Sequence, residues 1–374
     1  MTFYKKFPKS SGTKTTSTSD PLMQIAKKQK RKNRWRTVLI SSLASLTLLV
    51  AGTKVLTEIT SSHGRQVQDY YQTLSEIAYP NVDYRSSYFE PSSNFSGQFV
   101  SDRTKDIDGI QVFYERYIRN YSLTGAVYGN GMSTTTDQEG MTYTRLSNLK
   151  VPIFYNVKHT YDETSENPYD KTAQELSYVK EMTDQAVEVA LTFDKAYTIA
   201  EIAELVPDNL KVEWYWIGTE STFDTSQLGP SNQLGLEIYD QAELSAQQID
   251  QLEQIDSAEE YSQAYEKLVQ ENGELTDEKI INNNFTYFKK YAQKALDKGW
   301  LELISIGSED GTWTADQDLK VFLDKYKTGT EAKFAGIIVT GRAENFAQLE
   351  DKDWIFASSI GQSVQIQPYH KLDK

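Results

Sequence analysis

The chain has 374 residues, a net charge of −14 and no cysteine, which excludes disulfides, thiolate catalysis and cysteine-ligated metal sites. Residues 1–36 hold eleven Lys and Arg and a single acid, Asp20, whereas the other residues hold 28 bases and 52 acids. Two segments of opposite charge indicate two different environments. A basic segment can bind nucleic acid, but one that adjoins an apolar run more simply binds anionic lipid headgroups and fixes membrane topology.

An apolar run follows the basic segment directly. Thr37–Thr53 carries no charge, and the next three residues extend the run to 20, which as a helix span about 30 Å, the thickness of the hydrocarbon core of a bilayer. The alternative is a secretory signal cleaved after Gly52, but such signals have a shorter apolar core. We therefore predict a retained transmembrane helix over residues 37–56, with residues 1–36 in the cytoplasm and residues 57–374 outside the cell membrane. The bases next to the span that would fix this orientation are Lys27, Lys28, Lys30, Arg31, Lys32, Arg34 and Arg36.

Residues 57–172 are predicted to form a stalk helix and a small β-rich extracellular region. Residues 57–78 carry apolar side chains at helical intervals and precede Pro80, which ends the pattern. Short alternating runs between residues 82 and 160 indicate strands of a small sheet or its loops, and residues 161–172 resemble a linker. The apolar positions of the stalk are Val67, Tyr70, Tyr71, Leu74 and Ile77.

Residues 173–374 contain two strand–helix–strand patterns. In the first, strand 186–193 precedes a helix that opens with a capping box of Thr198 and Glu201, and "LKVEWYWI" follows as the second strand. In that strand Val212, Trp214 and Trp216 are predicted to share a core-facing side, with Tyr215 on the other.

The second pattern is strand 333–341, a short helix over 343–350, and a strand or bent strand pair around Gly361. Two such units predict an α+β fold with a split-βαβ, ferredoxin-like sheet. A helical insertion occupies about residues 220–332. One of its helices begins at Ser257 and stops at Gly273, and a longer one ends at Gly299; we expect them to form an antiparallel pair.

Four stretches of the chain resemble the sigma factor regulator family of Firmicutes. "VALTFDKAYTIAEIAELVPDNLKVEWYWIGT" and "FAGIIVTGRAENFAQLEDKDWIFASSIG" resemble its C-terminal domain, and "AKKQKRKNRWRTVLISSL" and "YPNVDYRSSYFEP" its N-terminal region. The resemblance implies a membrane-anchored anti-sigma factor. In that family's scheme a cytoplasmic segment holds an extracytoplasmic-function sigma factor away from RNA polymerase, and the outer domain senses the state of the envelope.

The cytoplasmic segment offers a single short amphipathic helix to such a partner. Pro21 suits the first helical position. Leu22, Ile25 and Ala26 then lie on one face, with Met23 beside them. These four residues are either a partner-docking surface or the apolar face of a juxtamembrane helix that lies on lipid.

Motifs for catalysis are missing from the sequence. The three histidines are widely separated, and neither a zinc-protease spacing nor a nucleophile elbow is present, so we predict no catalytic, cofactor-binding or metal-binding residues and no enzyme. The alternative function is a membrane-anchored extracellular binding or scaffold module for a cell-wall or protein ligand, in which the tail only sets topology. The many tyrosines favour such binding, and the acidic outer part suits a cationic partner.

Overall fold

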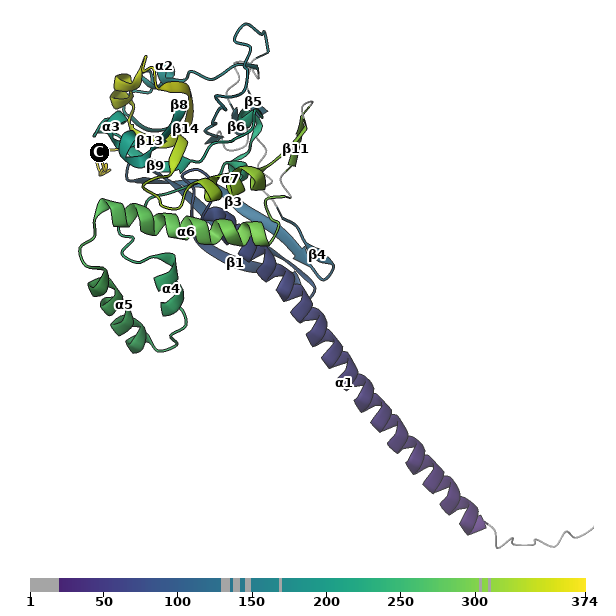
Figure 1. The fold of residues 1–374 in the computed structure, drawn as a ribbon. Coiled ribbons are helices and arrows are strands. Elements are labelled where there is room, and N and C mark those ends of the chain that lie inside the picture. Colours follow the sequence, from purple (N-terminus) through teal and green to yellow (C-terminus); the bar gives the residue numbers. More distant parts are fainter. Residues whose placement is uncertain are drawn as a thin grey trace, which may run out of the picture. The chain divides into compact units, whose positions relative to one another are not determined.

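The computed structural model describes residues 20–128, 135–136, 142–144, 149–167, 170–302, 305–308 and 311–374. The chain divides into two compact units, of which the first ends at Ile59 and the second runs from Thr60 to Lys374 (Figure 1). Helix α1, Asp20–Ser75, supplies the described residues of the first unit and the beginning of the second.

In the first unit, α1 exposes apolar side chains around its whole circumference. A helix that is apolar all round requires an apolar surrounding. Among the described residues, α1 holds the one stretch that is long and apolar enough to cross a membrane, with a mean hydropathy of 1.8. The exposed apolar residues include Val38, Leu39, Ile40, Leu43, Leu46, Leu48, Leu49 and Val50.

The last turns of α1 belong to the core of the second unit. The predicted stalk is helical as far as Ser75, but it is not a free-standing stalk, because Val67 and Tyr71 are buried against the first sheet. The Tyr71 ring stacks on Tyr117 with centroids 4.1 Å apart. This sheet is antiparallel, in the order β1-β2-β3-β4. Its strands are β1 (Asp83–Ser93), β2 (Ser96–Ile107), β3 (Ile110–Ser122) and β4 (Gly125–Ala126).

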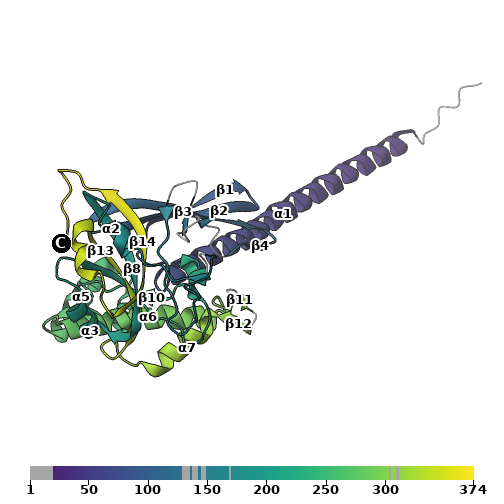
Figure 2. The ribbon, with the colours of Figure 1, turned by 90° about the horizontal axis from the view of Figure 1, so that it is seen from above.

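The second sheet has five strands in the order β10-β9-β13-β8-β14, and each neighbouring pair is antiparallel. Figure 2 labels β8, β10, β13 and β14 of this sheet. Strands β8 and β9 therefore run parallel to each other on either side of β13, and α3 connects them. The fold is mixed α+β, as predicted, and its sheets are antiparallel. The elements are β8 (Gln185–Thr198), α3 (Ile199–Leu205), β9 (Lys211–Trp216), β10 (Gly235–Leu236), β13 (Lys333–Arg342), the 3₁₀ helix η4 (Ala343–Leu349) and β14 (Ile355–Gln365).

The predicted faces of β9 are partly wrong. Trp214 and Trp216 share a face and pack with Phe154, as expected, but Val212 packs in the main core on the opposite side, with Tyr215. The pairing of β9 with β13 shifts between Trp214 and Val212, so one residue is extra. Such a bulge reverses the alternation of side chains beyond it.

The insertion covers the core of the second unit with two of its helices, α6 and α7. The two predicted helices are α5 and α6, but α4 lies against both, and α5 buries no residue. In Figure 1, α4 and α5 lie on the side of α6 that faces away from the five-stranded sheet. Helix α6 instead packs through Phe285 and Phe288 onto Phe322 of α7. The bounds are α4 (Ala246–Leu252), α5 (Ala258–Asn272), α6 (Asp277–Asp297) and α7 (Ala315–Lys325).

Shorter elements complete the described part of the chain. The run "VPIFYNVKH" forms no strand, although Phe154 within it is buried and stacks on Trp216, with ring centroids 5.0 Å apart. The remaining elements are β5 (Thr135–Thr136), β6 (Thr142–Thr144), β7 (Leu149–Lys150), α2 (Leu176–Val179), the 3₁₀ helices η2 (Thr225–Gln227) and η3 (Pro230–Asn232), β11 (Ser305–Ser308) and β12 (Gly311–Thr314).

Candidate functional site

A buried ion pair joins the two sheets of the second unit. The Nζ atom of Lys105 on β2 lies 2.6 and 2.8 Å from the two carboxylate oxygens of Glu188 on β8, and both residues are at most 1% exposed. The side-chain amide of Asn81 and the backbone N–H of Gln362 each donate to Glu188 at 2.9 Å. Burial lowers the pKa of Lys105, and the Glu188 carboxylate opposes that shift. The pair is fully hydrogen-bonded on the acid side, as a buried charge requires.

A second buried cation lies beside this pair. The guanidinium of Arg103 lies over the rings of Tyr79 and Tyr114, 5.7 and 5.1 Å from their centroids. Its Nε donates to the carbonyl oxygen of Glu115. Because Lys105 also lies over the Tyr114 ring, at 5.4 Å, β2 holds two cations on aromatic faces inside the unit.

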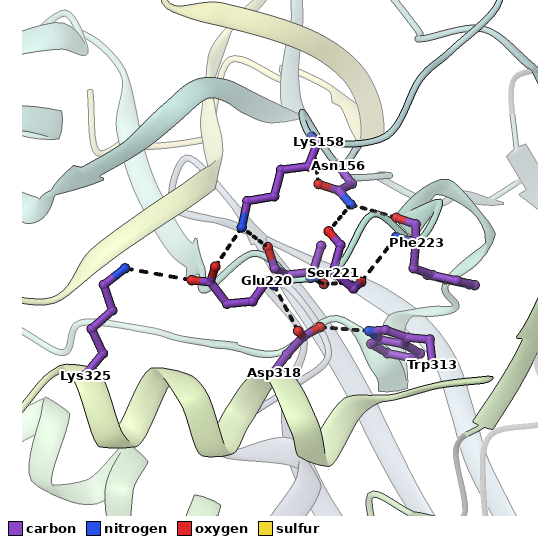
Figure 3. A network of polar contacts seen from close by, with 9 residues as sticks. Asn156, Lys158, Glu220, Ser221, Phe223, Trp313, Asp318 and Lys325 are labelled. Carbon is purple, nitrogen blue, oxygen red and sulfur yellow. Dashed lines mark hydrogen bonds and ion pairs between the residues drawn. The ribbon is translucent and has the colours of Figure 1, made fainter. Parts of the chain in front are cut away.

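A cavity of about 300 Å³ lies beside β8, β9 and α7 and contains an ion-pair network (Figure 3). The Glu220 carboxylate lies 2.7 Å from Nζ of Lys158 and 3.8 Å from Nζ of Lys325. The carboxylate of Asp318 accepts from the backbone N–H of Glu220 at 2.9 Å and from Nε1 of Trp313 at 2.8 Å. Hydrogen bonding from Lys158 lowers the pKa of Glu220, whereas burial raises the pKa of Asp318.

Asn156 fixes the rim of this smaller cavity. Its side-chain amide donates to the carbonyl oxygens of Ser221 and Phe223, at 2.9 and 2.8 Å, and its Oδ1 accepts from the backbone N–H of Lys158 at 2.9 Å (Figure 3). The charged side chains drawn there neutralise one another and tie three segments together. The network therefore has a structural role.

A larger cavity, of about 570 Å³, lies where the end of α1, the start of β1, the segment after β10 and α6 meet. Its charged lining is acidic and consists of Glu76, Asp83 and Glu237. Burial raises the pKa of all three carboxyl groups, and that of Glu237 reaches about 7. The neighbouring Asp83 carboxylate adds to the shift of Glu237, because like charges oppose ionisation.

Comparison with known protein families shows to which family the chain belongs. Residues 23–112 match the sigma factor regulator N-terminal family, and residues 179–362 match the sigma factor regulator C-terminal family. The chain belongs to the sigma factor regulator family. A search of curated proteins and a search of solved structures each found no match.

The buried ion pair connects the two matched regions of this sigma factor regulator. Lys105 lies in the N-terminal match, whereas Glu188 and Gln362 lie in the C-terminal match. The larger cavity is likewise lined from both regions, by Glu76 and Asp83 on one side and Glu237 on the other. The two regions therefore share a core and a cavity within the second unit.

The residues predicted to contact a cytoplasmic partner lie in the first turns of α1. Met23 and Ile25 are 62% and 61% exposed, and Ala26 is exposed as well. The side chain of Leu22 lies outside the described residues. All seven bases predicted to fix topology are exposed on the same helix, at positions 27, 28, 30, 31, 32, 34 and 36.

The ion pair and the acidic cavity were not predicted from the sequence. One signal for the pair was present, because Glu188 is a lone acid between Val187 and Val189 in an apolar strand. Glu76, Asp83 and Glu237 had no such signal, since isolated acids in polar segments are usually solvated.

Proposed function

We propose that this sigma factor regulator is a single-pass membrane anti-sigma factor for an extracytoplasmic-function sigma factor, with an outer unit that responds to the state of the envelope. The observation that carries the proposal is the order of parts. An apolar helix that could cross a membrane lies in the N-terminal family match, and the C-terminal match follows in the second unit. The family is a regulator family, so the proposed activity is binding and release of a protein rather than catalysis.

The orientation we propose places residues 1–36 in the cytoplasm and residues 57–374 outside the cell membrane. Its support is the basic segment before the span, because bases next to a transmembrane helix are retained on the cytoplasmic side.

The partner-docking surface we propose consists of Leu22, Met23, Ile25 and Ala26. Helix α1 runs without a break from Asp20 through the apolar span. In a continuous helix the first turns must leave the bilayer along the axis of the span, whereas a lipid-bound helix lies in the plane of the interface. The unbroken helix therefore supports docking of a partner over contact with lipid.

The finer fold assignment that we propose for the C-terminal region is a split-βαβ, ferredoxin-like sheet. Its support is the strand order β9-β13-β8-β14 together with the two connections, α3 between β8 and β9 and η4 between β13 and β14.

Deletion of residues 2–26 tests the proposal. We expect transcription from promoters of the cognate sigma factor to rise, while the protein stays in the membrane. Met23→Ser with Ile25→Ser should raise the same reporter, and Gln24→Ser with Gln29→Ser on the same exposed turns is the matched control. If another basic segment of equal length replaces residues 2–26 without any change in the reporter, the tail only sets topology and the chain is a membrane-anchored binding or scaffold module.

A further inference from the structure

The lining of the larger cavity combines carboxylates with aromatic rings. Besides the acids Glu76, Asp83 and Glu237, it contains five tyrosines, and none of the described lining residues is Lys, Arg or His. Aromatic faces attract cations, and buried carboxylates are stable when a cation pairs with them. The lining tyrosines are Tyr79, Tyr84, Tyr239, Tyr287 and Tyr291.

Hydrogen bonds hold this lining in place. The Tyr84 hydroxyl donates to a Glu76 carboxylate oxygen at 2.9 Å. The backbone N–H of Tyr239 donates to the side-chain oxygen of Asn284 at 3.2 Å, and the Asn284 amide donates back to the Tyr239 carbonyl at 3.1 Å. These contacts fix the segment after β10 to α6. The cavity is therefore built by the fold rather than left between mobile side chains.

Nearby cations have partners that do not line the cavity. Lys211 lowers the pKa of Asp83 and of Glu237 through its charge, but its own closest ion pair is with Asp373, whose carboxylate oxygen lies 2.8 Å from Nζ. Lys290 lowers the pKa of Glu76 through its charge, but it forms its ion pair with Asp250. Arg85 also lowers the pKa of Asp83, and its Nε donates to the Thr104 hydroxyl. None of these three side chains lines the cavity among the described residues, so its negative charge remains available to a ligand.

The spacing of the carboxylates favours an organic cation over a metal ion. Among the described residues, no group of three or more His, Cys, Asp or Glu lies close enough together to hold a metal. A cavity of about 570 Å³ is also of the size that accepts a small organic molecule. Carboxylates that do not converge on one point match a cation whose ammonium groups are separated along a chain.

We propose that the larger cavity binds an organic cation with two or more ammonium groups, which pair with Glu76, Asp83 and Glu237 while its apolar part packs on the tyrosines. Ser75, the last residue of α1, also lines the cavity, so the ligand would contact the end of that helix. The proposal goes beyond the proposed function and does not depend on sigma-factor binding.

Binding of such a cation should depend on pH. At pH 6 Glu237 is mostly protonated, because its pKa is raised to about 7 by burial and by Asp83, with Glu76 adding to the shift and Tyr239 and Lys211 opposing it. A cation binds the ionised form, so affinity increases as pH rises through 7 and levels off above it. Binding at pH 7 should release about half a proton per site, because Glu237 is about half protonated there.

Calorimetry of the full chain in detergent, with spermidine as the probe, tests the proposal. We expect one saturable site that binds spermidine several-fold more tightly at pH 8 than at pH 6. Glu237→Gln and Glu76→Gln should each weaken binding about tenfold, the size expected for one charge-assisted contact. Tyr287→Leu should weaken it a few-fold. Glu204→Gln, an exposed acid on α3, is the matched control and should leave affinity unchanged.

Several results would overturn the proposal. One is the absence of saturable spermidine binding, and another is binding of neutral triethylene glycol as tight as that of spermidine. A third is a loss of affinity in Glu204→Gln equal to that in Glu237→Gln, which would indicate attraction to the acidic surface as a whole. Melting temperatures of all variants show whether each one is folded, and Tyr287→Leu tests the site without changing a charge. Loss of reporter response in the tail variants would leave this result untouched, so the two proposals fail separately.

Discussion

Glu188 accepts hydrogen bonds from three separate parts of the second unit, which are β2, the connection before β1, and β14. A carboxylate removed from water is stable only when such partners are in place, and loss of one partner of a buried pair costs about 3–5 kcal/mol. Glu188 keeps these hydrogen bonds only if the residues packed around it leave room for its carboxylate. A Cβ atom added at Gly361 would lie 2.0 Å from one Glu188 oxygen, and that oxygen is held by Gln362.

Gly361→Ala should therefore destabilise the second unit. The new methyl group must displace either the Glu188 carboxylate or β14, and overpacking of this kind costs about 1–3 kcal/mol. Gly229→Ala is the matched control, since an added Cβ there meets nothing within 4 Å. Urea unfolding of the full chain in detergent measures the difference. Equal stability of the two variants would contradict the role given to the packing around Glu188.

Some helix boundaries are set by residues close together in the sequence, and the start of α3 is an example. The Thr198 hydroxyl accepts from the backbone N–H of Glu201 at 3.3 Å, while the Glu201 carboxylate accepts from the backbone N–H of Thr198 at 2.7 Å. The reciprocal pair satisfies amides that a helix start leaves open. Since both partners lie within four residues, the sequence was sufficient to predict this helix start.

Thr198→Ala should cost about 1 kcal/mol of unfolding free energy, the usual contribution of an N-cap. Ser262→Ala on α5 is the control, because that hydroxyl only donates to the carbonyl of Ala258 within its own helix, and its loss should change little. Hydrogen bonds from Thr198 lower the pKa of Glu201, so their stabilisation is present above the ordinary glutamate pKa and decreases as pH falls. The difference from wild type should therefore shrink in acid.

At the scale of the whole molecule, the distribution of charge supports the membrane topology that we propose. Bases within about 15–20 residues of a span orient it, whereas more distant ones contribute little. Seven such bases lie between Lys27 and Arg36, and four others lie near the N-terminus, at Lys5, Lys6, Lys9 and Lys14. The chain has no cysteine, so a single introduced cysteine can report which side of the membrane it occupies.

Replacement of the seven bases near the span by glutamine should give molecules of mixed orientation. A membrane-impermeant maleimide applied to intact cells should label Ser93→Cys in the otherwise wild-type chain and leave Ser11→Cys unlabelled. With the seven bases replaced, Ser11→Cys should become labelled. Replacement of the four distant bases is the control and should leave labelling unchanged. Labelling of Ser11→Cys in the otherwise wild-type chain would overturn the proposed orientation.

The sequence by itself determined the features that depend on neighbouring residues. The basic segment, the apolar run long enough to cross a membrane and the capping box at Thr198 are all local patterns in the sequence. They predicted the α+β class and the helices α3, α5 and α6, but not α2, α4 or α7. The face of Val212 was predicted wrongly, because a single extra residue in β9 changes the register, and the turn or pairing that creates it lies outside the strand.

Only the tertiary structure decided which faces are covered and which distant groups meet. Lys105 and Glu188 are 83 residues apart, and Glu188 lies on the strand face opposite Val187 and Val189, which alternation alone would assign to solvent. The larger cavity likewise combines acids from β1 and from the segment after β10. The burial of a polar residue depends on the packing of the two sheets, and that packing is set by contacts along the whole chain.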